Sequence, residues 1–301
     1  MSSGHGHTHG HAGATHRWRL QLAFGIITTF FVVELVAALA SRSLALLSDA
    51  GHMAADVVAL GAALVATRIA TRGDTSGQRT YGSYRAEVFA SGLAVLLMLG
   101  VSVYIAVEAV ARIGSPAEIA TGWMLTVGVL GLLANIAALS LLRGGATESL
   151  NVKGAYLEVV ADTLGSVGVI AAALLVAATG DAWWDTAFAL AIAAFVAVRA
   201  VLLGREVLHV LGQHAPTDAP PPEVAAALAS VPGVSDVHDL HLWTLTSGMD
   251  VATAHLVTLE GADPHAVLDG ARELMRTRFA IEHATLQVEP ESHVGCHEVT
   301  W

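Results

Sequence analysis

Six long apolar segments limit what this chain of 301 residues can fold into more than any other feature of its sequence. A helix of about 20 apolar residues crosses the hydrocarbon core of a bilayer, and helices satisfy their own backbone polar groups there. Short connections between such helices favour antiparallel neighbours. The sequence therefore predicts an α-helical membrane bundle of six transmembrane helices over residues 18–209. The segments run over residues 20–40, 44–70, 86–112, 119–142, 154–179 and 183–208.

The charge distribution indicates both the environment and the orientation of the chain. Charged residues make up 14% of the sequence, whereas a soluble domain carries about a quarter. The net charge of −11 argues against a nucleic-acid partner, which requires a basic face. With a cytoplasmic N-terminus, the basic residues near the segment ends gather on the cytoplasmic side, and only Arg42 and Arg112 lie opposite. We therefore expect a multi-pass protein of the cell (inner or plasma) membrane, with both termini in the cytoplasm.

Residues 210–301 have the composition of a separate cytosolic domain, which begins in a proline-rich linker. We expect a helix over 223–230, strands over 234–246 and 249–260, a second helix over 264–279 and a last strand over 284–289. Asp263 and Pro264 are typical of a helix start, as the N-cap and the first helical residue. The order α-β-β-α-β suits a small open-faced α+β sandwich.

Two pairs of ionisable residues lie inside the predicted membrane helices. His52 and Asp56 are four residues apart in the second segment, and Glu158 and Asp162 are four apart in the fifth. Residues four apart lie on one face of a helix. If the two helices face each other, one imidazole and three carboxylates meet, which is a donor set for zinc and for neighbouring divalent ions.

Each intramembrane charge costs about 2.5–3.5 kcal/mol on insertion scales and needs a partner. Buried hydrogen bonds or a position near the interface could explain isolated acids such as Glu34, Glu87 and Glu108. For the two pairs we expect no lysine or arginine nearby, so the carboxylates must take up protons or bind a cation. A divalent ion bound there leaves a net charge of −1, and we expect one carboxylate to keep a proton, shared with a neighbour such as Asp49.

Histidines also cluster outside the membrane segments. Residues 1–17 form a histidine-rich tail with imidazoles at His5, His7, His9, His11 and His16, a composition that favours soft divalent ions. A residual expression tag is the alternative. In the cytosolic domain, His238 and His255 could approach each other across the hairpin, although dispersed histidines are often surface or core residues. The triplet His293, Cys296 and His297 has ligand-like spacing near the end of the chain.

Five motifs together resemble the cation diffusion facilitator family, in particular its zinc-exporting bacterial branch. They are Ser48-Asp49-Ala50-Gly51-His52 leading to Asp56, Arg79-Thr80-Tyr81-Gly82-Ser83-Tyr84-Arg85-Ala86-Glu87-Val88, Asp162-Thr163-Leu164-Gly165-Ser166-Val167-Gly168, Val237-His238-Asp239-Leu240-His241-Leu242-Trp243 and Ile281-Glu282-His283-Ala284-Thr285-Leu286-Gln287-Val288-Glu289. The resemblance covers almost the whole chain.

The resemblance implies a six-span homodimer with a cytosolic domain of ferredoxin or metallochaperone type, which exports Zn²⁺ in exchange for protons. Its transport site matches His52, Asp56, Glu158 and Asp162, although zinc exporters commonly carry histidine at the position of Glu158. In the cytosolic domain His238, His255 and Glu289 fall at ligand-like positions, while Gln287 stands where a histidine can occur. Zn²⁺ would be both transported and regulatory, with no organic cofactor.

The expected function is therefore a proton-coupled antiporter for Zn²⁺, with Cd²⁺ and Co²⁺ as further substrates. A broad-range or Mn²⁺/Co²⁺ exporter is an alternative for the metal. A membrane-bound metal sensor or metalloenzyme is an alternative class, but the sequence has no His-Glu-x-x-His zinc-protease helix.

Overall fold

A computed structural model of the chain describes residues 11–70, 80–113, 119–143 and 150–292. Contacts divide the chain into two units, which are described separately. The helical unit comprises residues 1–65 and 90–204, and the sheet unit comprises residues 66–89 and 205–301. Five of the described helices are long and apolar enough to cross a membrane. A sixth long helix, α2, is not among them and carries the ionisable residues Asp49, His52 and Asp56.

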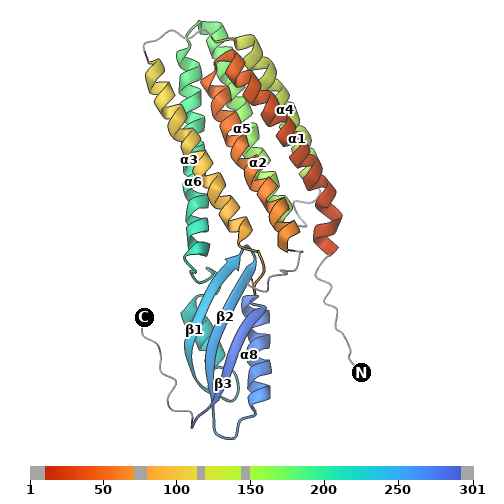
Figure 1. The fold of residues 1–301 in the computed structure, drawn as a ribbon, viewed down its shortest axis with the longest axis vertical. Helices are drawn as coiled ribbons and strands as arrows, with labels where there is room; N and C mark the ends of the chain where they lie inside the picture. Colours follow the sequence, from red (N-terminus) through yellow and green to blue (C-terminus); the bar gives the residue numbers. More distant parts are fainter. Residues whose placement is uncertain (1–10, 71–79, 114–118, 144–149, 293–301) are drawn as a thin grey trace. The chain divides into compact units, whose positions relative to one another are not determined.

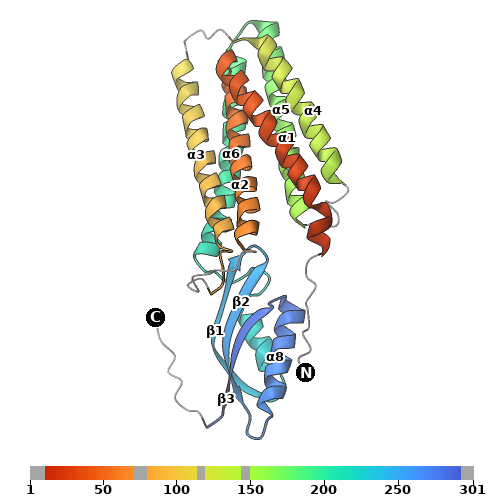
Figure 2. The same ribbon diagram turned by 45° about the vertical axis from the view of Figure 1, so that its right-hand side comes forward.

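Each of the six predicted apolar segments forms one helix (Figures 1 and 2). The predicted bounds of the second and third are confirmed, and the others agree within a few residues except at the start of α1. That helix begins at His11, inside the segment that we expected to be a tail, because a formed helix extends into polar residues at little cost. The bounds are α1 His11–Ser41, α2 Leu44–Ala70, α3 Ala86–Arg112, α4 Thr121–Arg143, α5 Leu150–Thr179 and α6 Trp183–Leu211.

Small residues allow the membrane helices to approach closely. A Cβ atom added at Gly131 on α4 would lie 2.6 Å from the Phe30 ring on α1. A Cβ atom at Gly165 on α5 would fall on the carboxylate of Asp49 on α2. Small residues at helix contacts are typical of membrane bundles, where close packing replaces the hydrophobic effect as the force between helices. Gly165 therefore lets α5 lie directly against the polar face of α2.

The start of α2 is capped by a carboxylate from α6. Asp185 accepts hydrogen bonds from the Ser43 hydroxyl at 2.6 Å, the Leu44 backbone N–H at 2.8 Å and the Ala45 backbone N–H at 3.2 Å. The Ser43 hydroxyl in turn accepts from the Leu46 backbone N–H at 3.1 Å. These contacts satisfy donors that the first turn of a helix leaves unpaired. Asp185 is fully buried and joins α6 to the beginning of α2.

The sheet unit contains the predicted α-β-β-α-β order, so the expected α+β domain is confirmed. Its elements are α7 Pro221–Ala229, β1 Val234–Thr246, β2 Met249–Thr258, α8 Pro264–Phe279 and β3 His283–Pro290. The β1–β2 pair is antiparallel and the β2–β3 pair is parallel. Asp263 caps α8 as predicted, because its side chain accepts from the His265 backbone N–H at 3.0 Å.

The two short helices and the sheet share one apolar core, and none of the helices described within this unit's core covers the other face of the sheet, called here the helix-free face. Alternate residues of β2, such as Ala252, Ala254 and Leu256, enter this core, so His255 lies on the opposite face. A bulge at Asp239, where φ is 51°, interrupts the alternation of β1. The register of β1, β2 and β3 therefore determines which side chains are neighbours on the helix-free face.

Candidate metal sites

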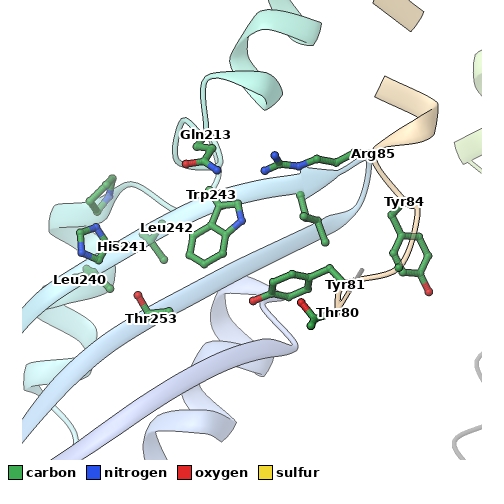
Figure 3. Close-up of a pocket in the computed structure, with 13 residues that line it drawn as sticks. Thr80, Tyr81, Tyr84, Arg85, Gln213, Leu240, His241, Leu242, Trp243 and Thr253 are labelled. Carbon is green, nitrogen blue, oxygen red and sulfur yellow. The ribbon is translucent and has the colours of Figure 1, made fainter. Parts of the chain in front are cut away.

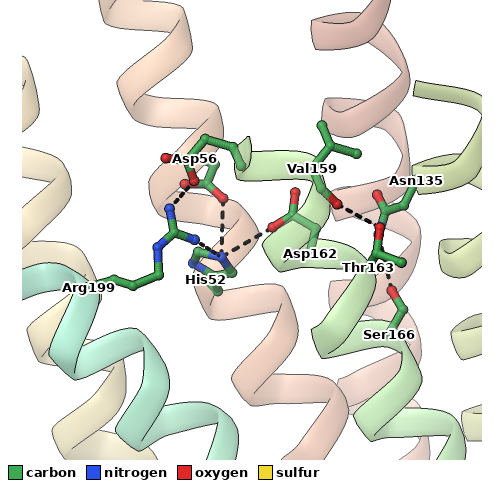
Figure 4. A network of polar contacts seen from close by, with 9 residues as sticks. His52, Asp56, Asn135, Val159, Asp162, Thr163, Ser166 and Arg199 are labelled. Carbon is green, nitrogen blue, oxygen red and sulfur yellow. Dashed lines mark hydrogen bonds and ion pairs between the residues drawn. The ribbon is translucent and has the colours of Figure 1, made fainter. Parts of the chain in front are cut away.

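Three of the four predicted membrane ligands converge between α2 and α5 (Figure 4). The Nε2 atom of His52 lies 3.2 Å from Oδ1 of Asp162 and 3.5 Å from Oδ2 of Asp56. Ligand atoms about 2.0 Å from a tetrahedral zinc are separated from one another by roughly 3.3 Å. The two distances therefore fit two edges of a zinc coordination tetrahedron, and the side chains need little rearrangement to bind an ion.

Glu158, the fourth predicted ligand, lies outside this group and its carboxylate accepts a hydrogen bond from Arg199 on α6. The same guanidinium places Nη1 at 3.0 Å from Nε2 of His52. The expectation that no arginine lies near these residues is therefore wrong. Glu158 and Arg199 are 41 residues apart in sequence and lie on different helices. Their contact depends on how α6 packs, so local spacing does not predict it.

A second acid pair lies beside this group. Glu34 on α1 and Asp49 on α2 are 1% and 2% exposed, and their carboxyl groups are close enough to interact electrostatically. Two ionised carboxylates repel each other in a buried environment, so a proton on one of them would relieve the repulsion. The sequence alone indicates that Glu34 is an isolated acid near the end of a span. The structure instead places it in the interior, where a single intramembrane acid needs a partner.

Polar contacts between α4 and α5 support the position of Asp162. Asn135 of α4 donates to the Ser166 hydroxyl at 3.2 Å, and both residues are buried. Ser166 lies one helical turn after Asp162 on α5. This hydrogen bond fixes the rotation of α5 about its axis close to the candidate ligand (Figure 4).

The sheet unit contains a second group of donors. His238 on β1 pairs with His255 on β2, and His255 pairs with Gln287 on β3, so the three lie side by side on the helix-free face. Nδ1 of His255 lies 3.0 Å from Oε1 of Glu289, and Nε2 of His238 lies 3.7 Å from Oε2. The three predicted ligands His238, His255 and Glu289 are thus close enough to hold one metal ion. Gln287 instead donates to Glu289 at 2.6 Å.

The motif between the second and third helices lines a pocket in the sheet unit. This pocket has a volume of about 1010 Å³ and is bounded by residues 80–85 and by β1 and β2. Figure 3 shows Trp243 of β1 projecting into it, with Tyr81 and Arg85 facing the strand. The ring of Tyr81 also makes an edge contact with His283 at 5.4 Å between centroids. None of the residues described as lining the pocket belongs to either donor group.

Comparisons with known proteins agree with this arrangement of helices and sheet. The model of the cation efflux transmembrane domain matches residues 20–211, and that of the cation efflux protein cytoplasmic domain matches residues 218–291. The chain belongs to the cation efflux family. The resemblance to cation diffusion facilitators is thereby confirmed, and the chain is a membrane transporter of cations and not an enzyme.

Relatives within the cation efflux family align over nearly the whole chain. The metal cation efflux system protein CzcD of Cupriavidus metallidurans is 43% identical over 95% of this chain and 90% of its own length. The cadmium, cobalt and zinc/H(+)-K(+) antiporter of Bacillus velezensis is 34% identical, over 96% of this chain and 93% of its own. The zinc transporter ZitB of Escherichia coli is 34% identical, over 99% of this chain and 96% of its own.

A solved structure of a single domain is similar to part of this chain. It is described as the metal-bound C-terminal domain of the CzcD transporter from Cuprividus metallidurans. It covers 23% of this chain and 94% of its own, with 38% identity and a TM-score of 0.22.

Some predicted metal ligands of this cation efflux protein lie outside the described residues. They include His5, His7 and His9 of the tail, and His293, Cys296 and His297 near the other end. The role of Arg199 and the buried partner of Glu34 were not predicted from the sequence. The signal for both was available, because an arginine or acid deep within an apolar segment requires a buried partner.

Proposed function

We propose that this chain exports Zn²⁺ from the cytoplasm in exchange for protons, with His52, Asp56, Glu158 and Asp162 as the transport site. The observation that carries this proposal is the approach of His52, Asp56 and Asp162 at zinc-like separations between membrane helices. An imidazole and carboxylates favour zinc and other borderline ions. The names of the relatives, which include zinc, cadmium and cobalt and one H(+)-K(+) antiporter, support the same class of cargo and coupling.

The site can couple two cations because its donors bind either a metal ion or protons. When an ion leaves, the buried carboxylates lose their positive partner, and protons are the cations that can replace it. The buried carboxyl pair of Glu34 and Asp49 is a candidate store for such a proton beside the site. A transporter that presents this site to one side of the membrane at a time would then exchange metal for protons.

Metal-driven flux in proteoliposomes tests this function directly. Purified protein in liposomes with an internal zinc dye and an internal pH dye should show zinc uptake together with alkalinisation of the lumen. A sensor would bind zinc without uptake, and a uniporter would take up zinc without a proton signal. Competition of Cd²⁺, Co²⁺ and Mn²⁺ with zinc uptake separates a zinc exporter from a broad-range or Mn²⁺/Co²⁺ exporter.

We further propose that both termini face the cytoplasm. In a Cys296→Ser background, Ala120→Cys between α3 and α4 should react with an impermeant maleimide added to intact cells. Asp218→Cys in the sheet unit should react only after the cells are opened. Both positions are exposed, so accessibility within the protein does not decide the outcome. Labelling of Asp218→Cys in intact cells would contradict the proposed orientation.

We propose that the sheet unit binds a regulatory zinc ion through His238, His255 and Glu289 and joins two chains in a homodimer. In the full-length protein, His255→Ala should remove one bound zinc per chain, because two donors cannot replace three at this site. Zinc titration by calorimetry should show this loss, while transport at saturating zinc continues.

His265→Ala is the matched control, since His265 is an exposed histidine of the same unit outside the donor group. An unchanged zinc stoichiometry in His255→Ala would contradict the cytosolic site. A single-chain mass in light scattering would contradict the homodimer.

A further inference from the structure

Arg199 is an arginine in the apolar sequence of α6, and its side chain is only 22% exposed. Its guanidinium contacts His52 and Glu158, which lie on two other helices. It also lies 5.9 Å from the ring centroid of Phe195 on its own helix. An arginine in this environment needs anionic or polar partners, and here its partners are two members of the proposed transport site.

The chemistry of the contact with His52 fixes its direction. A guanidinium has only donors, so Nη1 of Arg199 can donate to Nε2 of His52 in the tautomer that leaves Nε2 unprotonated. The accepting atom uses its lone pair for this hydrogen bond. That nitrogen is also the one that faces the carboxylates of Asp56 and Asp162, and a metal ion would bind the same lone pair. Arg199 and a metal ion therefore cannot occupy Nε2 of His52 together.

Arg199 also competes with a metal ion for the carboxylate of Glu158. The carboxylate of Glu158 accepts from Nη2 of the guanidinium and lies outside the group formed by His52, Asp56 and Asp162. The Glu158 side chain is 45% exposed, so it has room to turn. A metal ion that recruits Glu158 as a fourth ligand must take it from Arg199.

The charges of the group balance only when Arg199 is counted. Three carboxylates and a guanidinium sum to −2, which one divalent ion neutralises. Without the guanidinium, the same ion would leave a charge of −1, which is costly in a membrane interior. The positive charge of Arg199 thus compensates for the negative charge of Glu158. A neutral histidine at that position would need no such compensation.

We propose that Arg199 is a tethered cation that exchanges with the transported ion. It holds Nε2 of His52 and the carboxylate of Glu158 after the ion has left, and it releases both when an ion binds. This inference rests on the proposed transport site. It assigns Arg199 a positioning role, because the residue acts on metal affinity and release through two ligands and binds no metal itself.

Replacing Arg199 by glutamine tests the exchange. We expect Arg199→Gln to bind zinc at least about tenfold more tightly, because it removes both a competitor for Nε2 and a nearby positive charge. The KM for zinc should fall, and the maximal transport rate should fall about tenfold, because release becomes slow. Arg199→Lys keeps the charge, and its affinity and rate should lie closer to those of the unmodified protein.

The measurements are equilibrium zinc binding to full-length protein in detergent and initial rates of zinc uptake in proteoliposomes. Arg205→Gln is the matched control, since Arg205 is an exposed arginine on the same helix, and it should change neither quantity. Weaker zinc binding by Arg199→Gln, or unchanged binding and rate, would overturn the proposal. A merely structural role would lower affinity and rate together.

A double variant keeps the test decisive if Arg199→Gln does not fold. Arg199→Gln combined with Glu158→Gln restores the charge balance, so its maximal rate should exceed that of either single variant. A double variant no faster than Glu158→Gln alone would contradict the exchange. Absence of zinc uptake by the unmodified protein would instead reject the proposed function, so the two failures are distinguishable.

Discussion

Asp162→Ala should lower zinc uptake by about a hundredfold or more while the protein remains folded and inserted. The substitution removes one of the three grouped donors, the other two being His52 and Asp56. Mutation of a residue that only supports a metal ligand lowers metal affinity or activity by about 10–100-fold. Loss of a ligand itself should lower zinc uptake at least as much. Initial rates of zinc uptake in proteoliposomes, at equal amounts of reconstituted protein, measure the effect.

Two further variants make this result specific. Asp56→Ala removes another donor of the same group and should have an effect of similar size. Glu206→Ala replaces an exposed acid on α6 outside the group and should transport normally. A size-exclusion profile like that of the unmodified protein shows that each variant is folded. Full transport by either aspartate variant would exclude this group as the transport path.

Asp185→Ala should produce the largest loss of stability. It removes an acceptor for the Ser43 hydroxyl and for two backbone N–H groups of α2, all of them buried. Each donor left unsatisfied costs about 1–3 kcal/mol, so we expect a loss of about 2–5 kcal/mol in the free energy of unfolding. Asp185→Asn keeps one carbonyl acceptor and should lose less. Thermal unfolding of the detergent-solubilised protein measures the difference.

Asp181→Ala is the control for this prediction. Asp181 is an exposed acid just before α6 and accepts one backbone hydrogen bond, from Trp183 at 2.9 Å. Its loss should cost about 1 kcal/mol, the usual value for a helix cap. Equal losses for the two substitutions would show that the cap on α2 contributes no more than an ordinary surface cap.

The fold was largely predictable because its signals are local. Long apolar segments define membrane helices without knowledge of their partners. In the sheet unit, Ser247 and Gly248 mark the hairpin, and Asp263 with Pro264 marks the start of α8. The strands were found from their alternation, which a single apolar core on one side of the sheet produces. The early start of α1 was missed because residues 11–19 carry no apolar periodicity.

The candidate membrane site was predictable only in part. Spacing of four residues predicts His52 beside Asp56, and the structure brings Asp162 of the second pair close to both. Spacing within one helix does not say which face of another helix it meets. The contact of Arg199 with Glu158 depends on the rotation of α6, and that of Glu34 with Asp49 depends on the packing of α1. Both are set by tertiary packing.

The cap that Asp185 places on α2 has a mechanical consequence. Three hydrogen bonds tie the first turn of α2 to α6, so a tilt of one helix moves the end of the other. His52 and Asp56 thus belong to a linked pair of helices, together with Arg199. Asp162 and Glu158 lie on α5, outside that link. If α5 slid along the linked helices α2 and α6, the proposed ligands on α5 would separate from those on α2. The ligands within each helix would keep their positions relative to one another.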